Sequence, residues 1–159
     1  MFIQGRAGTG KTFLTNKLIQ FLRDKGRSVL VCGTTGIAAS QYKNATTLHS
    51  LFNLGIDQKN QESLFKSKIG LYTYKYYLIK NADLIIIDEV SMLTKQIADR
   101  VDYSLRYIMN NGDVVGKDLK YLPPFGSKKI LFVGVSIQVS CTAALRASVL
   151  NTCPGYILV

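Results

Sequence analysis

The stretch that decides the fold is "GRAGTGKT", residues 5–12, which matches the pattern GxxxxGK[ST] at every fixed position. Glycines in such a loop let backbone N–H groups turn inward around phosphate oxygens. The helix predicted directly after the loop adds the positive end of its dipole to the same place. A chance match would lack a helix after the loop, so the sequence predicts a site for the phosphates of a nucleotide.

Individual residues of this loop have expected roles. In a loop of this kind the lysine neutralises the β- and γ-phosphates of ATP, and the hydroxyl that follows it binds Mg²⁺. We therefore expect Lys11 to contact phosphate and Thr12 to be a magnesium ligand. The rest of the predicted ATP-binding loop consists of Gly5, Arg6, Ala7, Gly8, Thr9 and Gly10.

Four short apolar runs predict β-strands, at residues 2–4, 28–33, 83–88 and 130–134. They are continuous rather than alternating, which is typical of strands buried on both faces of a parallel sheet. Helical patterns separate them, at residues 12–25 and 91–109, and the segment 59–80 is expected to be a basic, tyrosine-rich insertion of helix and loop. The apolar positions of the two helical patterns are Leu14, Leu18 and Leu22, then Ile97, Val101, Leu105 and Ile108.

Alternating strands and helices predict an α/β fold in which a parallel sheet is flanked by helices. Ligands bind to such sheets outside the carboxyl ends of the strands. The run "LIIIDEVSML" ends its strand at Asp88 and Glu89, which places two carboxylates at that edge. We expect Asp88 to bind Mg²⁺ and Glu89 to act as the general base that polarises the attacking water. Acidic residues at the end of a strand can also be plain helix caps.

Five segments in order resemble the motifs of the PIF-type DNA helicases of superfamily one, which are related to the RecD helicases. They are "GRAGTGKT", "TTGIAAS" (34–40), "TLHSLF" (47–52), "IIIDEVSML" (85–93) and "PFGSKKILFVG" (124–134). The resemblance implies a P-loop NTPase (RecA-like) fold. It also implies that the chain represents only the first motor domain of such a helicase. It also implies ATP-driven unwinding from 5′ to 3′ and roles in DNA repair, recombination and telomere maintenance.

The resemblance also implies a surface for single-stranded DNA, because small and hydroxyl side chains allow close approach to a nucleic-acid backbone. The residues it assigns there are Thr34, Thr35, Gly36, Thr47 and His49. Two alternatives remain open. The segment 34–40 is also typical of an ordinary turn from strand to helix. A lone histidine is more often a structural side chain than a ligand or base.

Other side chains leave two interpretations open. Tyrosines and lysines of the insertion could stack on bases, or the tyrosines could pack on the domain itself. These are Tyr72, Tyr74, Tyr76, Tyr77, Lys75 and Lys80. We expect Arg100 and Arg106, on the helix after Glu89, to face solvent.

The chain departs from the family pattern after residue 134. Gln138 stands where the family has the glutamine that senses the γ-phosphate, but Val135 replaces an aspartate and "VSC" replaces Leu-Pro-Pro. We therefore expect an N-terminally clipped ATP-binding domain at 1–134 and a divergent tail, not a domain, at 135–159, as in a truncated or frame-shifted product.

Missing family parts would limit activity. In the family a second RecA-like domain supplies arginines to the γ-phosphate, and such arginines raise rates by about 10³–10⁵. The lone domain is expected to hydrolyse ATP slowly and not to unwind DNA. The alternative to a helicase is a helicase-derived remnant that binds nucleotide or single-stranded DNA without turnover; a different P-loop ATPase, such as a loader, is a third interpretation.

Composition agrees with a polyanionic partner. The chain has 20 Lys and Arg against 10 Asp and Glu, a formal charge of +10 and a pI near 9.6, which suits nucleic acid or simply maintains solubility.

No apolar run reaches the roughly 18 residues of a membrane span, and no secretory signal is evident. Three widely spaced cysteines and one histidine argue against zinc and for an intracellular location, the nucleus in a eukaryote or the cytoplasm in a bacterium or virus. The oligomeric state is left open.

Overall fold

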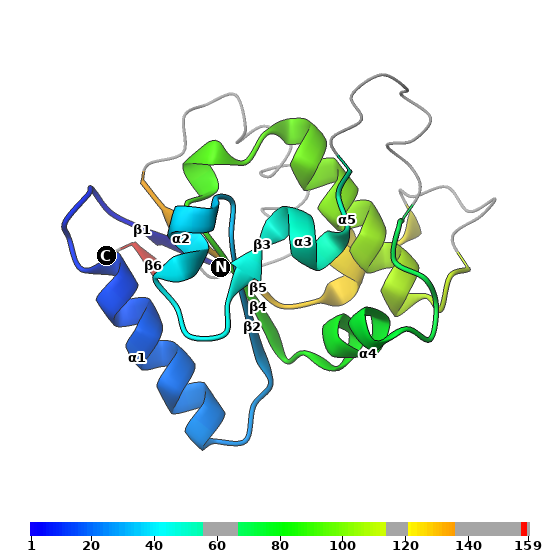
Figure 1. The fold of residues 1–159 in the computed structure, drawn as a ribbon, viewed down its shortest axis with the longest axis horizontal. Coiled ribbons are helices and arrows are strands. Elements are labelled where there is room, and N and C mark those ends of the chain that lie inside the picture. The colour runs from blue at the N-terminus through cyan, green and yellow to red at the C-terminus, as the bar shows by residue number, and fades with distance from the viewer. Residues whose placement is uncertain (56–66, 114–120, 136–156, 159) are drawn as a thin grey trace.

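The computed structural model describes residues 1–55, 67–113, 121–135 and 157–158 of the 159. Its centre is one six-stranded sheet in the order β3-β2-β4-β5-β1-β6, in which every neighbouring pair is parallel. The predicted α/β fold with a parallel sheet flanked by helices is confirmed (Figure 1). The strands are β1 (Phe2–Gln4), β2 (Val29–Gly33), β3 (Thr46–Thr47), β4 (Leu84–Asp88), β5 (Ile130–Gly134) and β6 (Ile157–Leu158).

Helices cover both faces of the sheet. In Figure 1 α1 runs down one side of the strands, and α3, α4 and α5 lie together on the other. Within the described residues no helix has the length and apolar character needed to cross a membrane. The helical elements are α1 (Lys11–Asp24), α2 (Gly36–Ser40), α3 (Leu48–Phe52), α4 (Tyr74–Asn81), η2 (Val90–Met92), α5 (Lys95–Met109) and η4 (Pro124–Ser127).

The central strands are apolar on both faces because each face has its own core. Along β4, Ile85 and Ile87 pack with α3, α4 and α5, whereas Ile86 packs on the α1 side. Along β5 the same alternation sends Phe132 to the first core and Leu131 to the second. Successive side chains of a strand point to opposite faces, so a continuous apolar run is what a sheet between two helical layers requires.

The first helix begins where the phosphate loop ends. Gly10 is its N-cap and has φ 84°, a left-handed conformation that glycine adopts without a steric penalty. The predicted leucine stripe of this helix is only partly correct. The fully buried residues are Thr15 and Ile19, whereas Leu14 is 41% exposed. Each buried position therefore follows a leucine of the predicted stripe by one residue, and the leucines lie beside the buried face of the helix.

The predicted helix at 91–109 is two elements. The short 3₁₀ turn η2 follows Glu89, and α5 begins only at Lys95, after Thr94. The Thr94 hydroxyl accepts a hydrogen bond from the Ile97 amide, a standard N-cap contact that satisfies a free donor of the first helical turn. The expected apolar stripe is otherwise correct, because Val101, Leu105 and Ile108 are buried.

The expectation that Arg106 faces solvent is wrong. Its side chain is only 9% exposed, and its Nε lies 2.8 Å from Oδ2 of Asp102, one turn earlier on α5. The guanidinium also donates to the Leu122 carbonyl oxygen, and the second Asp102 oxygen accepts from the Phe125 amide. The ion pair therefore holds the segment around η4 against α5. Arg100 is only half-buried and donates to the Gly55 carbonyl oxygen at 3.1 Å.

The tyrosine-rich insertion divides between the two interpretations. Tyr76 on α4 is 1% exposed and packs in the core, whereas Tyr72 and Tyr74 are 70% and 80% exposed. Lys75 does not project freely, since its Nζ donates to the Ser50 carbonyl oxygen at 2.6 Å and so ties α4 to α3. The part of the insertion at 59–66 lies outside the described residues. Packing explains Tyr76, and a contact of the exposed tyrosines with DNA stays a prediction.

A methyl group at residue 33 is expected to destabilise the fold. An added Cβ on Gly33 would lie 2.8 Å from the Thr35 carbonyl oxygen and 2.9 Å from the Ala38 carbonyl carbon, and these atoms belong to backbone that cannot rotate away. We expect Gly33→Ala to lower the free energy of unfolding by about 2–3 kcal/mol in a urea titration. Gly36→Ala is the matched control, because a Cβ there meets nothing within 4 Å. Equal stability of the two variants would contradict the close approach.

The Asp102–Arg106 pair is expected to contribute more than an exposed pair of the same spacing. Asp102→Ala leaves a buried guanidinium without its carboxylate, and the expected loss is about 2–4 kcal/mol in the same titration. Asp99→Ala removes the pair of Lys95 with Asp99 on the same helix, where both side chains are about half exposed or more, and should cost less than about 0.5 kcal/mol. Similar losses in both variants would show that the buried pair does not hold η4.

Candidate nucleotide-binding site

The carboxyl ends of four strands meet at one edge of the sheet. Gly33 at the end of β2 is in register with Asp88 at the end of β4, and Gln4 at the end of β1 is in register with Gly134 of β5. The Gly5 amide continues this pairing by donating to the Gly134 carbonyl oxygen at 3.3 Å. The predicted phosphate loop and the predicted acidic pair therefore lie on the same edge, as expected for this fold.

The loop at 5–12 is folded around its own lysine. Lys11 Nζ donates to the carbonyl oxygens of Gly5 at 2.7 Å and Arg6 at 2.8 Å. Thr9 Oγ1 donates to the same Arg6 oxygen at 2.9 Å, and Gly8 has φ 78°. The ammonium is thus held at the centre of the loop, where incoming phosphate oxygens would replace the carbonyl oxygens as its partners.

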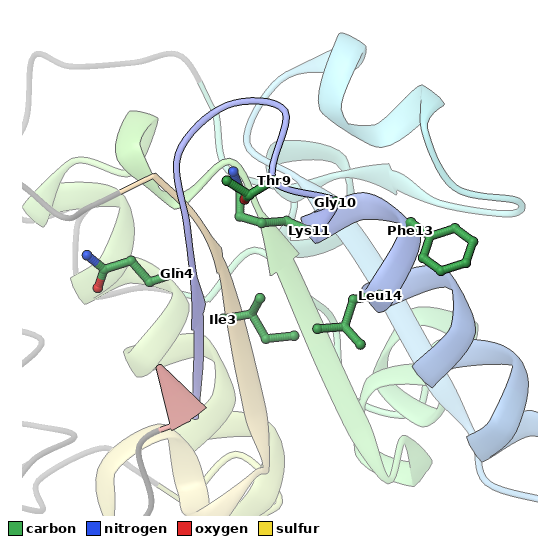
Figure 2. A pocket seen from close by; sticks show the side chains of 7 residues that line it. All are labelled: Ile3, Gln4, Thr9, Gly10, Lys11, Phe13 and Leu14. Carbon is green, nitrogen blue, oxygen red and sulfur yellow. The ribbon is translucent and has the colours of Figure 1, made fainter. Parts of the chain in front are cut away.

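A cavity of about 340 Å³ opens beside this loop. Figure 2 shows it between β1 and the start of α1, with the Ile3 and Leu14 side chains pointing toward each other beneath the loop. Its volume is within the range of small-molecule sites. Seven residues line it: Ile3, Gln4, Thr9, Gly10, Lys11, Phe13 and Leu14.

Asp88 is the buried carboxylate of the site, with 7% of its surface exposed. Its Oδ1 accepts a hydrogen bond from the Glu89 amide at 2.7 Å, and its Oδ2 accepts from the Tyr42 hydroxyl at 2.6 Å. Burial and this hydrogen bond to the carboxylate raise the pKa of Tyr42 well above its usual value, so the phenol remains a donor. Both oxygens of Asp88 are therefore held in place by the protein.

Glu89 has a strained backbone. Its φ and ψ are 58° and 47°, the left-handed conformation that costs a residue with a side chain roughly 1–2 kcal/mol. Strain of this kind concentrates at functional sites, where the surrounding structure maintains it. The residue is half-buried, and its Oε1 accepts from the Ser91 hydroxyl at 2.9 Å in an exposed contact. Glu89 is the N-cap residue of η2, but its side chain makes no cap hydrogen bond to that turn, and its role as a general base stays a prediction.

The residues predicted to hold Mg²⁺ fit that ion. Thr12 and Asp88 supply a hydroxyl and a carboxylate, the oxygen ligands that Mg²⁺ prefers. Thr12 follows Lys11 at the start of α1, and Asp88 ends β4, so both expected ligands lie on the edge of the sheet where the phosphate loop lies. Each Asp88 oxygen accepts one protein hydrogen bond and has a further lone pair available for water or metal.

Hydroxyls predicted to contact DNA also hold the turns in which they lie. Thr35 and Thr47 cap α2 and α3 by accepting from the amides of Ala38 and Ser50. Thr34 bonds to the acidic pair instead, with its hydroxyl donating to the Glu89 carbonyl oxygen at 2.8 Å and its amide to that of Asp88 at 3.1 Å. The strand-to-helix turn is present, and contact with DNA stays a prediction.

The other two predicted DNA residues are accessible. Gly36 and His49 are exposed at the starts of α2 and α3. Gln138 lies outside the described residues, so its expected role at the γ-phosphate stays a prediction. Val135 follows β5 and is 37% exposed. Tyr42 is the site residue that sequence reasoning missed, because it lies in "SQYKN" between two motifs and has no spacing signal of its own.

Comparison with known proteins agrees with this geometry. The family model described as PIF1-like helicase matches residues 1–152. The chain belongs to the PIF1-like helicase family. The predicted resemblance is thereby confirmed, together with the RecA-like fold that it implied.

Individual Pif1 helicases are similar to the chain in sequence and in structure. The chain is 33% identical to the ATP-dependent DNA helicase Pif1 of Campylobacter jejuni over 142 residues, a match that covers 81% of this chain and 30% of that protein. The crystal structure of the Pif1 helicase from Candida albicans is 30% identical, with a TM-score of 0.65, and the match covers 84% of this chain and 28% of that one. Bacteroides Pif1 in complex with ADP-AlF3 and ssDNA is 25% identical with a TM-score of 0.68, over 99% of this chain and 37% of that chain.

The chain is short beside its relatives. It spans 30%, 20% and 15% of the length of the helicases of Campylobacter jejuni, Psychrobacter and Saccharomyces cerevisiae that it matches. The similarity therefore concerns only a part of each of those helicases. The division of this chain into a domain at 1–134 and a tail at 135–159 stays a prediction.

Proposed function

We propose that this chain forms the ATP-binding motor domain of a 5′-to-3′ DNA helicase. The observation that carries the proposal is the convergence of Lys11, Asp88 and Glu89 at one edge of the sheet, with Thr34 of a predicted DNA-contact segment bonded to the last two. Each group has a place in coupling ATP hydrolysis to movement on DNA. The names of the relatives, ATP-dependent DNA helicases, support the same function.

In the proposed function the loop at 5–12 binds the phosphates of ATP. The Lys11 ammonium exchanges its contacts with the Gly5 and Arg6 oxygens for phosphate oxygens, and the backbone amides of the loop contribute further donors. Thr12 and Asp88 would hold Mg²⁺ by direct and water-mediated contact. The ion would neutralise charge on the phosphates when it is bound.

Glu89 is the proposed general base. Its carboxylate accepts a hydrogen bond from Ser91 through Oε1 and has a second oxygen with which to accept a proton from water. Glu89 would therefore orient and deprotonate the water that attacks the γ-phosphate.

Single-stranded DNA is the proposed second ligand. The net charge of +10 attracts a polyanion, and the exposed residues Gly36 and His49 lie at the starts of the two short helices. Thr34 connects this surface to the acidic pair through two hydrogen bonds. We include DNA repair, recombination and telomere maintenance among the proposed roles of the complete helicase.

The lysine of the loop gives the first test of the proposal. We expect Lys11→Ala to weaken binding of a fluorescent ADP at least tenfold and to abolish ATP hydrolysis stimulated by single-stranded DNA, because the phosphates lose their central cation. Lys17→Ala is the matched control, since Lys17 is exposed on the same helix and lies over the Phe13 ring, 5.8 Å from its centroid. Unchanged affinity in Lys11→Ala would overturn the site assignment.

The general base can be tested separately from binding. Glu89→Gln keeps the oxygen that accepts from Ser91 but removes the basic carboxylate, so nucleotide affinity should stay within about twofold while hydrolysis falls by about 10²–10⁴. The assay is phosphate release at saturating ATP and DNA. Asp99→Asn, an exposed carboxylate on α5, should hydrolyse ATP at the unmodified rate. A rate for Glu89→Gln close to the unmodified rate would remove Glu89 from this role.

A remnant that binds nucleotide or DNA without turnover is the second candidate. One observation favours it: Val135 follows β5 where the family pattern has an aspartate. The two candidates differ in a single measurement on the unmodified chain. Hydrolysis that single-stranded DNA stimulates supports the motor domain, whereas ADP binding with no phosphate release at any DNA concentration supports the remnant.

A further inference from the structure

Tyr42 contacts Asp88 at the edge of the sheet where the strands end, although it belongs to none of the sequence motifs that predict a function for that edge. It lies in the connection between α2 and β3, and its side chain is 5% exposed. The Tyr42 hydroxyl donates to Asp88 Oδ2 at 2.6 Å, a separation typical of a charge-assisted O–H···O⁻ bond. A phenylalanine would fill the same apolar space but would leave Asp88 Oδ2 without this donor.

The ring of Tyr42 is fixed by packing. It belongs to the core between the sheet and α1, together with Ile19, Val31 and Ile86. The backbone is also held, since the Tyr42 amide donates to the Ala39 carbonyl oxygen at 3.1 Å. A side chain locked in this way presents its hydroxyl at one place with little loss of conformational freedom, which is what a residue that positions another requires.

The hydroxyl of Tyr42 bonds to one of the groups expected to bind the metal, the Asp88 carboxylate. Its ring packs in the same core as Ile19 of α1. On that helix Thr15 is buried, and its Oγ1 donates to the Lys11 carbonyl oxygen at 2.8 Å. Tyr42 therefore connects the helix that begins at the phosphate loop to the carboxylate at the end of β4.

From this arrangement we propose that Tyr42 is a positioning residue for the magnesium site, which orients the Asp88 carboxylate toward the ion through its hydroxyl. The inference rests on the proposed binding of magnesium and nucleotide. Tyr42 takes one lone pair of Oδ2 and the Glu89 amide takes one of Oδ1, so the lone pairs left for the ion and its waters have a fixed direction. Removing a residue that hydrogen-bonds to a metal ligand typically weakens metal affinity by about 10–100-fold.

The test measures metal affinity apart from catalysis. In the full chain saturated with ADP, Mn²⁺ is titrated and its free concentration is followed by electron paramagnetic resonance. We expect Tyr42→Phe to weaken Mn²⁺ binding about tenfold. ADP affinity measured in EDTA should stay within about twofold of the unmodified chain, because the Tyr42 hydroxyl bonds to Asp88, whereas the cation of the phosphate loop, Lys11, bonds to Gly5 and Arg6.

Tyr76→Phe is the matched control. Tyr76 is a buried tyrosine whose hydroxyl also bonds to a side chain, the Asn111 oxygen at 3.0 Å, but it lies on α4 on the other face of the sheet. The variant should keep both affinities. Asp88→Asn gives the second arm. If Tyr42 acts through the carboxylate, Tyr42→Phe added to Asp88→Asn should weaken Mn²⁺ binding no further.

A measurement on the unmodified chain covers the case in which a variant fails to fold. With tyrosine labelled by ¹³C at Cζ, adding Mg²⁺ to the ADP complex should shift the Tyr42 resonance and leave that of Tyr76 in place. Metal affinity unchanged or tighter in Tyr42→Phe, or an unmoved Tyr42 resonance, overturns the inference alone. An unmodified chain whose ADP affinity is the same in Mg²⁺ and in EDTA overturns the proposed magnesium site as well.

Discussion

The alignment of strand ends is the constraint on which the rest of the structure depends. Parallel pairing puts Gly33 opposite Asp88 and Gln4 opposite Gly134, so four connections leave the sheet at one edge. Residues far apart in the sequence meet there because the strands pair in this register, and contacts such as that of Tyr42 with Asp88 are added to it. A slip of one residue in β4 would take Asp88 out of register with Gly33, so the geometry of the site depends on this pairing.

The fold could be predicted because its signals are local. Continuous apolar runs at β2, β4 and β5 and a glycine-rich loop before a helix are sufficient to indicate a parallel sheet with helices on both faces. Helix boundaries were less accessible, because the start of α5 depends on the cap formed by Thr94 rather than on periodicity. The burial of Arg106 was missed for a similar reason. Its partner Leu122 is distant in sequence, and a charged residue on a helix ordinarily faces water.

The site was predictable to the extent that motifs mark it. The positions of Asp88 and Glu89 at the end of β4 and of Lys11 at the start of α1 could be predicted from the sequence, and their roles with phosphate and metal stay predictions. Tyr42 could not be predicted, since its role depends on the distance from its hydroxyl to Asp88, and only the folded chain determines that distance. The threonines fall between these cases. Their positions were expected, but their bonds to the turns and to Glu89 were not.

The apolar run of β4 has a consequence for the chain before it folds. A stretch that is apolar on both faces, as Ile85–Ile87 must be between two cores, is also a segment prone to β-aggregation when exposed. Asp83 and Asp88 flank it with negative charge. The Ser28 amide and Arg27 lower the pKa of Asp83, which keeps that end ionised in the folded protein. Charged residues in such flanking positions are typical gatekeepers against self-association. The carboxylate proposed to hold magnesium would thus also protect the nascent strand.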